Sequence, residues 1–273
     1  MEQQQESELP IFGRKVFFLN PTFSMRAVID TLKKEEYEVY VLIDYKLAKA
    51  YMRIHHDALL YINPEEQLPI AAWLNFFRTL KEDPTFSSTT IGICCERLAP
   101  LDLKALQDCP YITGGIFRTE GQPNSIIPSL TEKLDSLGAK GKRKFVRADC
   151  TNDASAGFLW ISGGRMFKAR LIDISTASVA ILLPSSNLPF LNTKTEIVVS
   201  LQLNGRQLQV HVKALVVKPN GPNSYAAIFV INNETTEENN ITLIREYIFE
   251  TLERDITQSV MGFAIDKTNY ASV

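Results

Sequence analysis

Residues 197–212 have the sequence IVVSLQLNGRQLQVHV, and this stretch decides the architecture of the second half of the chain. Apolar residues alternate with polar ones on both sides of Asn204-Gly205, at Val199, Leu201, Leu203, Leu208, Val210 and Val212. Asn-Gly is the preferred pair for a two-residue type I′ turn. The pattern therefore predicts a β-hairpin with one buried face.

Short strands and turns surround this hairpin. Phe167–Ile172 and Tyr225–Val230 have strand-like patterns, and Pro219-Asn220-Gly221-Pro222 is typical of a turn. Thr236–Asp255 then carries apolar residues at helical spacing, at Ile241, Ile244, Ile248 and Leu252. We expect the second half to be a small antiparallel barrel closed by a C-terminal helix.

The first half has a different pattern, in which strand-like runs alternate with helical ones. The predicted strands are Val16–Leu19, Val39–Ile43, Ala58–Ile62, Thr90–Cys94 and Ile112–Phe117. The predicted helices are marked by Met25, Val28 and Leu32, by Ala71, Leu74, Phe77 and Leu80, and by the segments Asp102–Gln107 and Ile126–Leu137. Such alternation is typical of a parallel sheet covered by helices, so we expect a doubly wound α/β domain.

A segment rich in glycine and lysine, Ser136–Lys142, separates the two patterns. We therefore expect a disordered or extended N-terminus over 1–13, an α/β domain over 14–135 and a linker over 136–142. A barrel domain over 143–258 and a C-terminal tail over 259–273 complete the predicted organisation.

The composition is that of an ordinary globular protein, with 45% hydrophobic residues and a net charge of −2. This balance gives no indication of a nucleic-acid partner. The longest uncharged window, 174–193, is interrupted by Pro184 and Pro189, so we expect no membrane-spanning segment. Residues 1–10 lack the basic and apolar runs of a signal peptide, and we expect the protein in the cytoplasm.

The residues that commonly bind metals or form disulfides are few and poorly spaced. The four cysteines, at positions 94, 95, 109 and 150, include no Cys-x-x-Cys, and His55 and His56 are two of only three histidines. We expect the cysteines to be reduced and mostly buried. We predict no metal, no cofactor and no catalytic residues.

Basic residues gather at the start of the second half. Residues 140–170 contain eight Lys or Arg and two Asp, with Arg143 and Arg147 four positions apart. Asp173-Ile-Ser175-Thr-Ala-Ser178 follows the predicted strand Phe167–Ile172. From charge alone, an anionic ligand and a solvated linker are equally good explanations of the basic cluster.

This ordered set of features resembles the PilZ family, bacterial receptors for cyclic di-GMP with the motifs Arg-x-x-x-Arg and Asp/Asn-x-Ser-x-x-Gly. The set comprises the arginine pair after a linker, the Asp-x-Ser motif after a strand, the Asn204-Gly205 hairpin, the strand ending Ala227-Ile228-Phe229 and the terminal helix. The resemblance implies a six-stranded antiparallel PilZ β-barrel with a C-terminal helix over Lys142 to about Asp255. It implies cyclic di-GMP as the ligand of Arg143, Arg147, Asp173, Ser175, Ser178 and Lys142.

The residue types suit this ligand. An arginine fork matches the O6 and N7 atoms of guanine or forms an ion pair with a phosphate. Asp173 is suited to accept from the N1–H and N2–H₂ donors of guanine, and Ser175 offers a hydroxyl. The same residues also have ordinary explanations: the arginines as exposed linker charges, and Asp173 and Ser175 as turn caps.

Two positions qualify the resemblance. Ser178 stands where the family has glycine, a residue that permits backbone conformations with positive φ. Lys142 precedes the arginine pair at a position that influences, in the family, whether one or two ligand molecules are held. A basic residue there favours two.

The first half resembles a response-regulator receiver domain, which is fused before PilZ domains in spirochaetes. The places that hold metal and phosphate in a working receiver are occupied by Asn20-Pro21, Asn63-Pro64, Cys94-Cys95 and Arg118. We therefore predict a pseudo-receiver that is not phosphorylated. Asp44 and Asp57 are more simply explained as helix caps or exposed loop residues.

Together these features predict a non-enzymatic cyclic di-GMP effector in which the ligand reorients the two domains. Its protein partner is unknown, and the family resemblance implies motility as one controlled process. The apolar helices of the first half allow a homodimer. The alternative is an interaction scaffold in which both domains are degenerate and cyclic di-GMP does not bind.

Overall fold

The computed structural model describes residues 10–270 of the 273-residue chain, with side chains described as far as Met261. The chain divides into two compact units. The first contains the chain up to Lys144 together with the segment from Ile256 onward, and the second spans Phe145–Asp255. The division therefore falls between Arg143 and Arg147, the two arginines of the motif.

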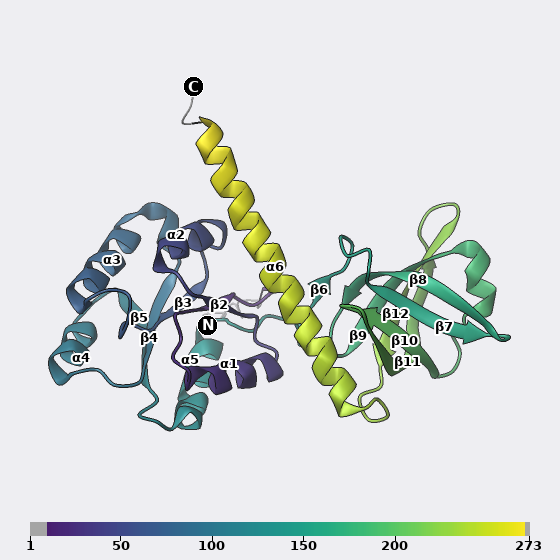
Figure 1. Cartoon of the computed structure of the whole chain (residues 1–273), viewed down its shortest axis with the longest axis horizontal. Coiled ribbons are helices and arrows are strands. Elements are labelled where there is room, and N and C mark those ends of the chain that lie inside the picture. The colour runs from purple at the N-terminus through teal and green to yellow at the C-terminus, as the bar shows by residue number, and fades with distance from the viewer. Residues whose placement is uncertain (1–9, 271–273) are drawn as a thin grey trace, which may run out of the picture. The chain divides into compact units, whose positions relative to one another are not determined.

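The first unit contains a five-stranded parallel sheet (Figure 1). Its strands are β1 (Val16–Leu19), β2 (Val39–Leu42), β3 (Leu59–Ile62), β4 (Thr90–Cys95) and β5 (Ile112–Arg118). They lie in the order β2-β1-β3-β4-β5, with every neighbouring pair parallel. This is the flavodoxin-like doubly wound order, and it confirms the predicted α/β architecture.

Helices cover both faces of this sheet because its strands are apolar on both sides. The helices are α1 (Met25–Lys34), α2 (Tyr45–Ile54), α3 (Ile70–Glu82), α4 (Pro100–Gln107) and α5 (Ile127–Ser136), with the 3₁₀ turns η1 (Pro84–Phe86) and η2 (Pro123–Ile126). Buried residues of α1 and α5 pack with Phe18 of β1, whereas the Phe17 ring faces Tyr51 of α2. Asp44 caps α2 by accepting from the Lys46 amide at 2.9 Å, as expected of a helix cap.

The second unit is a closed antiparallel barrel (Figure 1). Its strands are β6 (Ala148–Asp149), β7 (Gly157–Ser162), β8 (Arg165–Ile174), β9 (Ser178–Pro184), β10 (Ile197–Leu203), β11 (Arg206–Pro219) and β12 (Ser224–Ile231), with the 3₁₀ turn η3 (Ser185–Phe190). The order is β6-β8-β7-β10-β11-β12-β9, and β8 also pairs with β9. That last pairing closes six strands into a barrel, as predicted, and leaves β6 as a short addition.

The hairpin at Asn204-Gly205 has the predicted geometry. Leu203 pairs with Arg206 across the turn, and both turn residues have positive φ, 47° for Asn204 and 74° for Gly205. Leu201 and Val210, from the alternating apolar set, are fully buried in the barrel core. The type I′ turn therefore sets the register that sends the apolar face inward.

Helix α6 (Glu238–Tyr270) follows the barrel. Ile244 and Ile248 of its predicted apolar face are buried in the barrel core. The helix continues to Tyr270, so residues 259–270 are helical where we expected a tail. Within the described part of the chain, no helix is both long and apolar enough to cross a membrane.

Candidate functional site

A β-bulge in β8 brings Asp173 to the surface of the barrel. Leu171 pairs with Ile181 and Asp173 pairs with Ala180, so Ile172 is an extra residue in β8. Leu171 and Ile174 are both fully buried although they lie three positions apart, whereas Asp173 is partly exposed. An unbroken strand would place Asp173 on the same inward face as Leu171. The bulge shifts the alternation by one residue and turns the carboxylate outward.

Arg147 forms an ion pair with this carboxylate. Its Nη1 atom lies 3.4 Å from Oδ1 of Asp173, and the two side chains are 35% and 33% exposed. Arg147 directly precedes β6, where Ala148 pairs with Ile174 and is fully buried. The short strand β6 therefore fixes the arginine beside the end of β8. A partly exposed pair at this distance contributes only about 0–1 kcal/mol, so Arg147 can exchange Asp173 for another anion at little cost.

A second carboxylate, Asp149, lies opposite Asp173 in the β6–β8 pairing. Its Oδ1 accepts from the Thr151 amide at 2.7 Å and from the Thr151 hydroxyl at 2.6 Å, which holds the following turn. We did not predict Asp149 from the sequence as part of the site. Only the register of β6 reveals it, and a two-residue strand has no alternation from which register is predicted.

Ser175 and Ser178 close the turn between β8 and β9. The Ser175 hydroxyl accepts from the Ser178 amide at 3.0 Å and lies 3.1 Å from the Ser178 hydroxyl. Ser175 is fully buried. These contacts are those of a turn cap, one of the two explanations considered for Ser175.

Ser178 occupies the motif's glycine position without backbone strain. It is the first residue of β9, pairs with Val230 and is not among the described non-glycine residues that have positive φ. A serine is therefore compatible with the local backbone. The difference from glycine at this position lies in the added side chain, which bonds to Ser175.

Lys142 and Arg143 belong to the first unit and not to the barrel. Their amides donate to the carbonyl oxygens of Pro10 at 2.8 Å and Ile11 at 3.1 Å. Arg147, Asp173, Ser175 and Ser178 thus belong to the barrel unit, whereas Lys142 and Arg143 belong to the first unit. These two backbone bonds attach the end of the predicted linker, 136–142, and the residue after it to Pro10 and Ile11.

Two carboxylates of the first unit, Glu65 and Glu66, follow Asn63-Pro64 in the segment after β3. The Glu65 carboxylate accepts from the amides of Glu96, at 2.7 Å, and Arg97, while Glu66 accepts from the Asn20 side chain at 3.2 Å. These bonds occupy Glu65 in holding the loop after β4, and among the described residues no cluster of three or more metal-ligating side chains occurs.

The cysteines are free, as expected. Cys94, Cys95 and Cys150 are buried and Cys109 is half-buried. Burial raises the pKa of the Cys95 thiol to about 12 and of the Cys150 thiol to about 11. Thiols with raised pKa values are poor nucleophiles at neutral pH, so these two residues fit a structural role.

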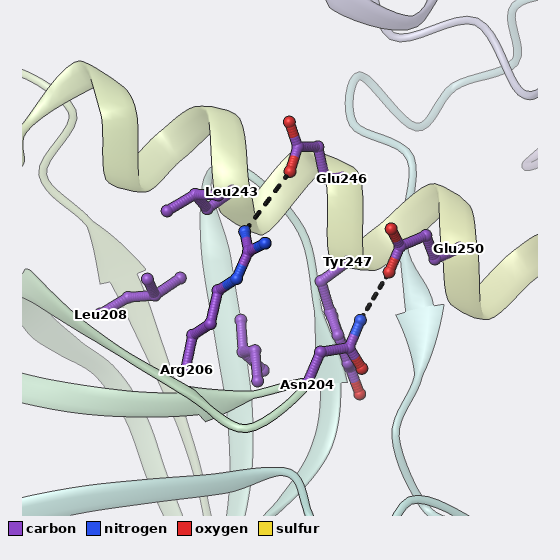
Figure 2. Close-up of a pocket in the computed structure, with 8 residues that line it drawn as sticks. Asn204, Arg206, Leu208, Leu243, Glu246, Tyr247 and Glu250 are labelled. Atoms are coloured by element: carbon purple, nitrogen blue, oxygen red, sulfur yellow. Dashed lines mark hydrogen bonds and ion pairs between the residues drawn. The ribbon is translucent and has the colours of Figure 1, made fainter.

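The pocket shown in Figure 2 lies between the β10–β11 hairpin and α6. Asn204 donates to Glu250 at 2.6 Å, and Arg206 lies 3.8 Å from Glu246. The volume of the pocket is about 100 Å³. Pockets for small-molecule ligands are typically about 300–1,000 Å³, so this one fits a hairpin clamped onto the helix better than a ligand site.

Tyr247 fastens the same helix to the loop after β6. Its hydroxyl donates to Oδ2 of Asp153 at 2.9 Å and lies 3.6 Å from Sγ of Cys150. The ring is buried, and burial raises the pKa of the Tyr247 hydroxyl above its ordinary value. The loop that leads from β6 to β7 is therefore anchored close to the motif residues.

The chain is similar in structure to several solved PilZ proteins. It matches the PilZ domain with c-di-GMP of YcgR from Escherichia coli at 12% identity and a TM-score of 0.36, over 43% of this chain and 96% of that one. It matches the PlzA protein of Borreliella burgdorferi in complex with c-di-GMP at 16% identity and a TM-score of 0.29, over 46% of this chain and 49% of that one.

A third similar structure is the Bacillus subtilis inhibitor of motility, MotI/DgrA, at 12% identity and a TM-score of 0.30. That match covers 40% of this chain and 49% of the other, so this chain spans about half the length of the second and third structures. No protein-family model matches the sequence, and no curated protein matches it.

Proposed function

We propose that this protein is a cytoplasmic, non-catalytic effector that binds cyclic di-GMP at the Arg147–Asp173 site of the barrel. The observation that carries the proposal is the bulge that turns Asp173 outward beside Arg147, 3.4 Å away. The two groups offer complementary chemistry to one guanine nucleotide. Asp173 accepts from the N1–H and N2–H₂ edge, and Arg147 donates to O6 and N7 or to a phosphate.

Guanine recognition is tested by comparing cyclic di-GMP with cyclic di-AMP at the same salt concentration. The two ligands carry the same charge and differ in their base edges, so electrostatic attraction alone binds both equally. We expect micromolar or tighter binding of cyclic di-GMP, with cyclic di-AMP weaker by about ten- to a hundredfold. Equal affinities would refute recognition by Asp173.

Lys142 leads us to expect two ligand molecules per chain.

The division of the chain suggests how binding becomes a signal. Arg143 belongs to the first unit and Arg147 to the barrel, so a ligand that contacts both arginines links the two units. In this proposal the ligand favours one arrangement of the units and thereby reorients the pseudo-receiver, which contacts a protein partner such as a motility component. Solution scattering is expected to change on ligand addition in the wild type and not in Arg147→Ala.

A scaffold that does not bind cyclic di-GMP is the second candidate. The burial of Ser175 and the presence of Ser178 in the glycine position favour it, because both reduce what the motif offers to a ligand. A folded wild type that gives no heat with either dinucleotide and no shift in melting temperature would support the scaffold.

A further inference from the structure

The segment Pro10–Arg14, which we name the N-terminal clasp, forms hydrogen bonds with the segment 138–143, which ends at Arg143. Besides the two bonds from Lys142 and Arg143, the Arg14 amide donates to the Gly138 carbonyl at 2.9 Å. The Arg14 guanidinium also donates to the carbonyls of Leu137 at 3.1 Å and Ser88 at 2.8 Å. The clasp is thus hydrogen-bonded both to the segment 138–143 and, through Arg14, to Ser88 in the first unit.

Two glycines allow the clasp and the segment 138–143 to approach closely. A Cβ atom at Gly13 would collide with the carbonyl group of Ala139, and one at Gly141 would lie 2.5 Å from the carbonyl carbon of Phe12. Backbone atoms cannot move aside as the end of a flexible side chain does. The contact therefore depends on glycine on both sides, which is typical of a specific packing arrangement.

Within the clasp, the ring of Phe12 supports Arg143. The centre of the Arg143 guanidinium lies 4.3 Å from the ring centroid, although Phe12 is 59% exposed. A guanidinium donates hydrogen bonds in its own plane, so an aromatic ring against its face leaves those donors available to a ligand. An exposed ring that contributes little to the core is well suited to orient an arginine.

We propose that Phe12 is a positioning residue for cyclic di-GMP, acting through Arg143; this inference rests on the proposed function. A free arginine side chain loses much rotational freedom when it binds a ligand, and an aromatic support removes part of that loss in advance. The clasp fixes the backbone of Arg143, and Phe12 restricts its side chain. Arg143 is therefore already oriented before the ligand binds.

The test measures cyclic di-GMP affinity in Phe12→Ala, Phe12→Trp, Arg143→Ala and the Phe12→Ala/Arg143→Ala double variant. A cation–π contact at an exposed site predicts about two- to fivefold weaker binding in Phe12→Ala and wild-type affinity in Phe12→Trp. In the Arg143→Ala background the Phe12 substitution is expected to have no further effect. Phe23→Ala is the matched control, because Phe23 is 84% exposed and has Arg26 5.5 Å from its ring.

The outcomes separate this inference from the proposed function. A wild type that binds while Phe12→Ala binds equally well, or loses affinity equally in the Arg143→Ala background, would overturn the positioning role alone. A wild type that does not bind would overturn the proposed function and the role of Phe12 in it. The contact itself has an independent measure, because the Arg143 Nε–Hε resonance is expected to show a ring-current shift that Phe12→Ala abolishes.

Discussion

Replacing Asp173 by asparagine separates the site's role in binding from its role in stability. The Arg147–Asp173 pair is 3.4 Å long with both side chains about one-third exposed, so its loss is expected to lower the free energy of unfolding by less than about 1 kcal/mol. Binding is expected to weaken by about ten- to a hundredfold, because an amide cannot accept from both donors of the guanine edge.

The sign of the effect makes this prediction discriminating. Cyclic di-GMP carries two negative phosphates, so removing a nearby carboxylate charge would by itself strengthen binding. Asp149→Asn is the control, because Asp149 lies directly opposite Asp173 and its loss removes the same charge. We expect Asp149→Asn to bind the ligand as tightly as the wild type or more tightly, and Asp173→Asn to bind it more weakly.

Calorimetric titration of the three proteins at one salt concentration gives the affinities, and urea unfolding gives the stabilities. If Asp173→Asn binds cyclic di-GMP as tightly as the wild type, or more tightly, the proposed contact between this carboxylate and guanine is refuted. If the free energy of unfolding of the variant falls by several kcal/mol, the Arg147–Asp173 pair contributes more to stability than is expected of a partly exposed ion pair.

Three further substitutions test other parts of the structure. Ser178→Gly is expected to tighten ligand binding severalfold, since it removes a side chain at the motif together with its contact to the Ser175 hydroxyl; unchanged affinity in a titration would exclude this residue from the site. Tyr247→Phe loses the hydrogen bond to Asp153 and is expected to lower the free energy of unfolding by about 1 kcal/mol, measured with urea. Burial lowers the pKa of His55 from 6.5 to about 4, so between these values the unfolded chain binds more protons and stability rises with pH. The wild-type melting temperature is therefore expected to rise from pH 5 to pH 7 by more than that of His55→Phe, and equal rises would contradict this origin.

The elements with strong local patterns were predictable from the sequence. The five parallel strands, the Asn204-Gly205 hairpin and the buried face of α6 all follow from hydrophobic periodicity and turn chemistry. Helix α2 was not predicted as a helix, although Asp44 was identified as a helix cap or exposed loop residue. The turn at Gly163-Gly164 was also missed, even though two glycines between Trp160 and Phe167 are a recognisable hairpin signal.

The details of the site depend on features that a sequence pattern does not specify. The bulge at Ile172 changes which side of β8 faces the core, and alternation alone gives the wrong side for Asp173. The pairing of Asp149 with Asp173 depends on a two-residue strand. The hold on Arg143 depends on backbone bonds to residues more than a hundred positions away, at the start of the chain.

The most direct test of the central claim is titration of the full chain with cyclic di-GMP beside the Arg143→Ala/Arg147→Ala double variant, at the same salt concentration. The account predicts micromolar or tighter binding in the wild type and its loss in the double variant, with both proteins folded. Undiminished binding in the variant would show that the ligand uses another site, and absence of binding in a folded wild type would contradict the receptor proposal itself.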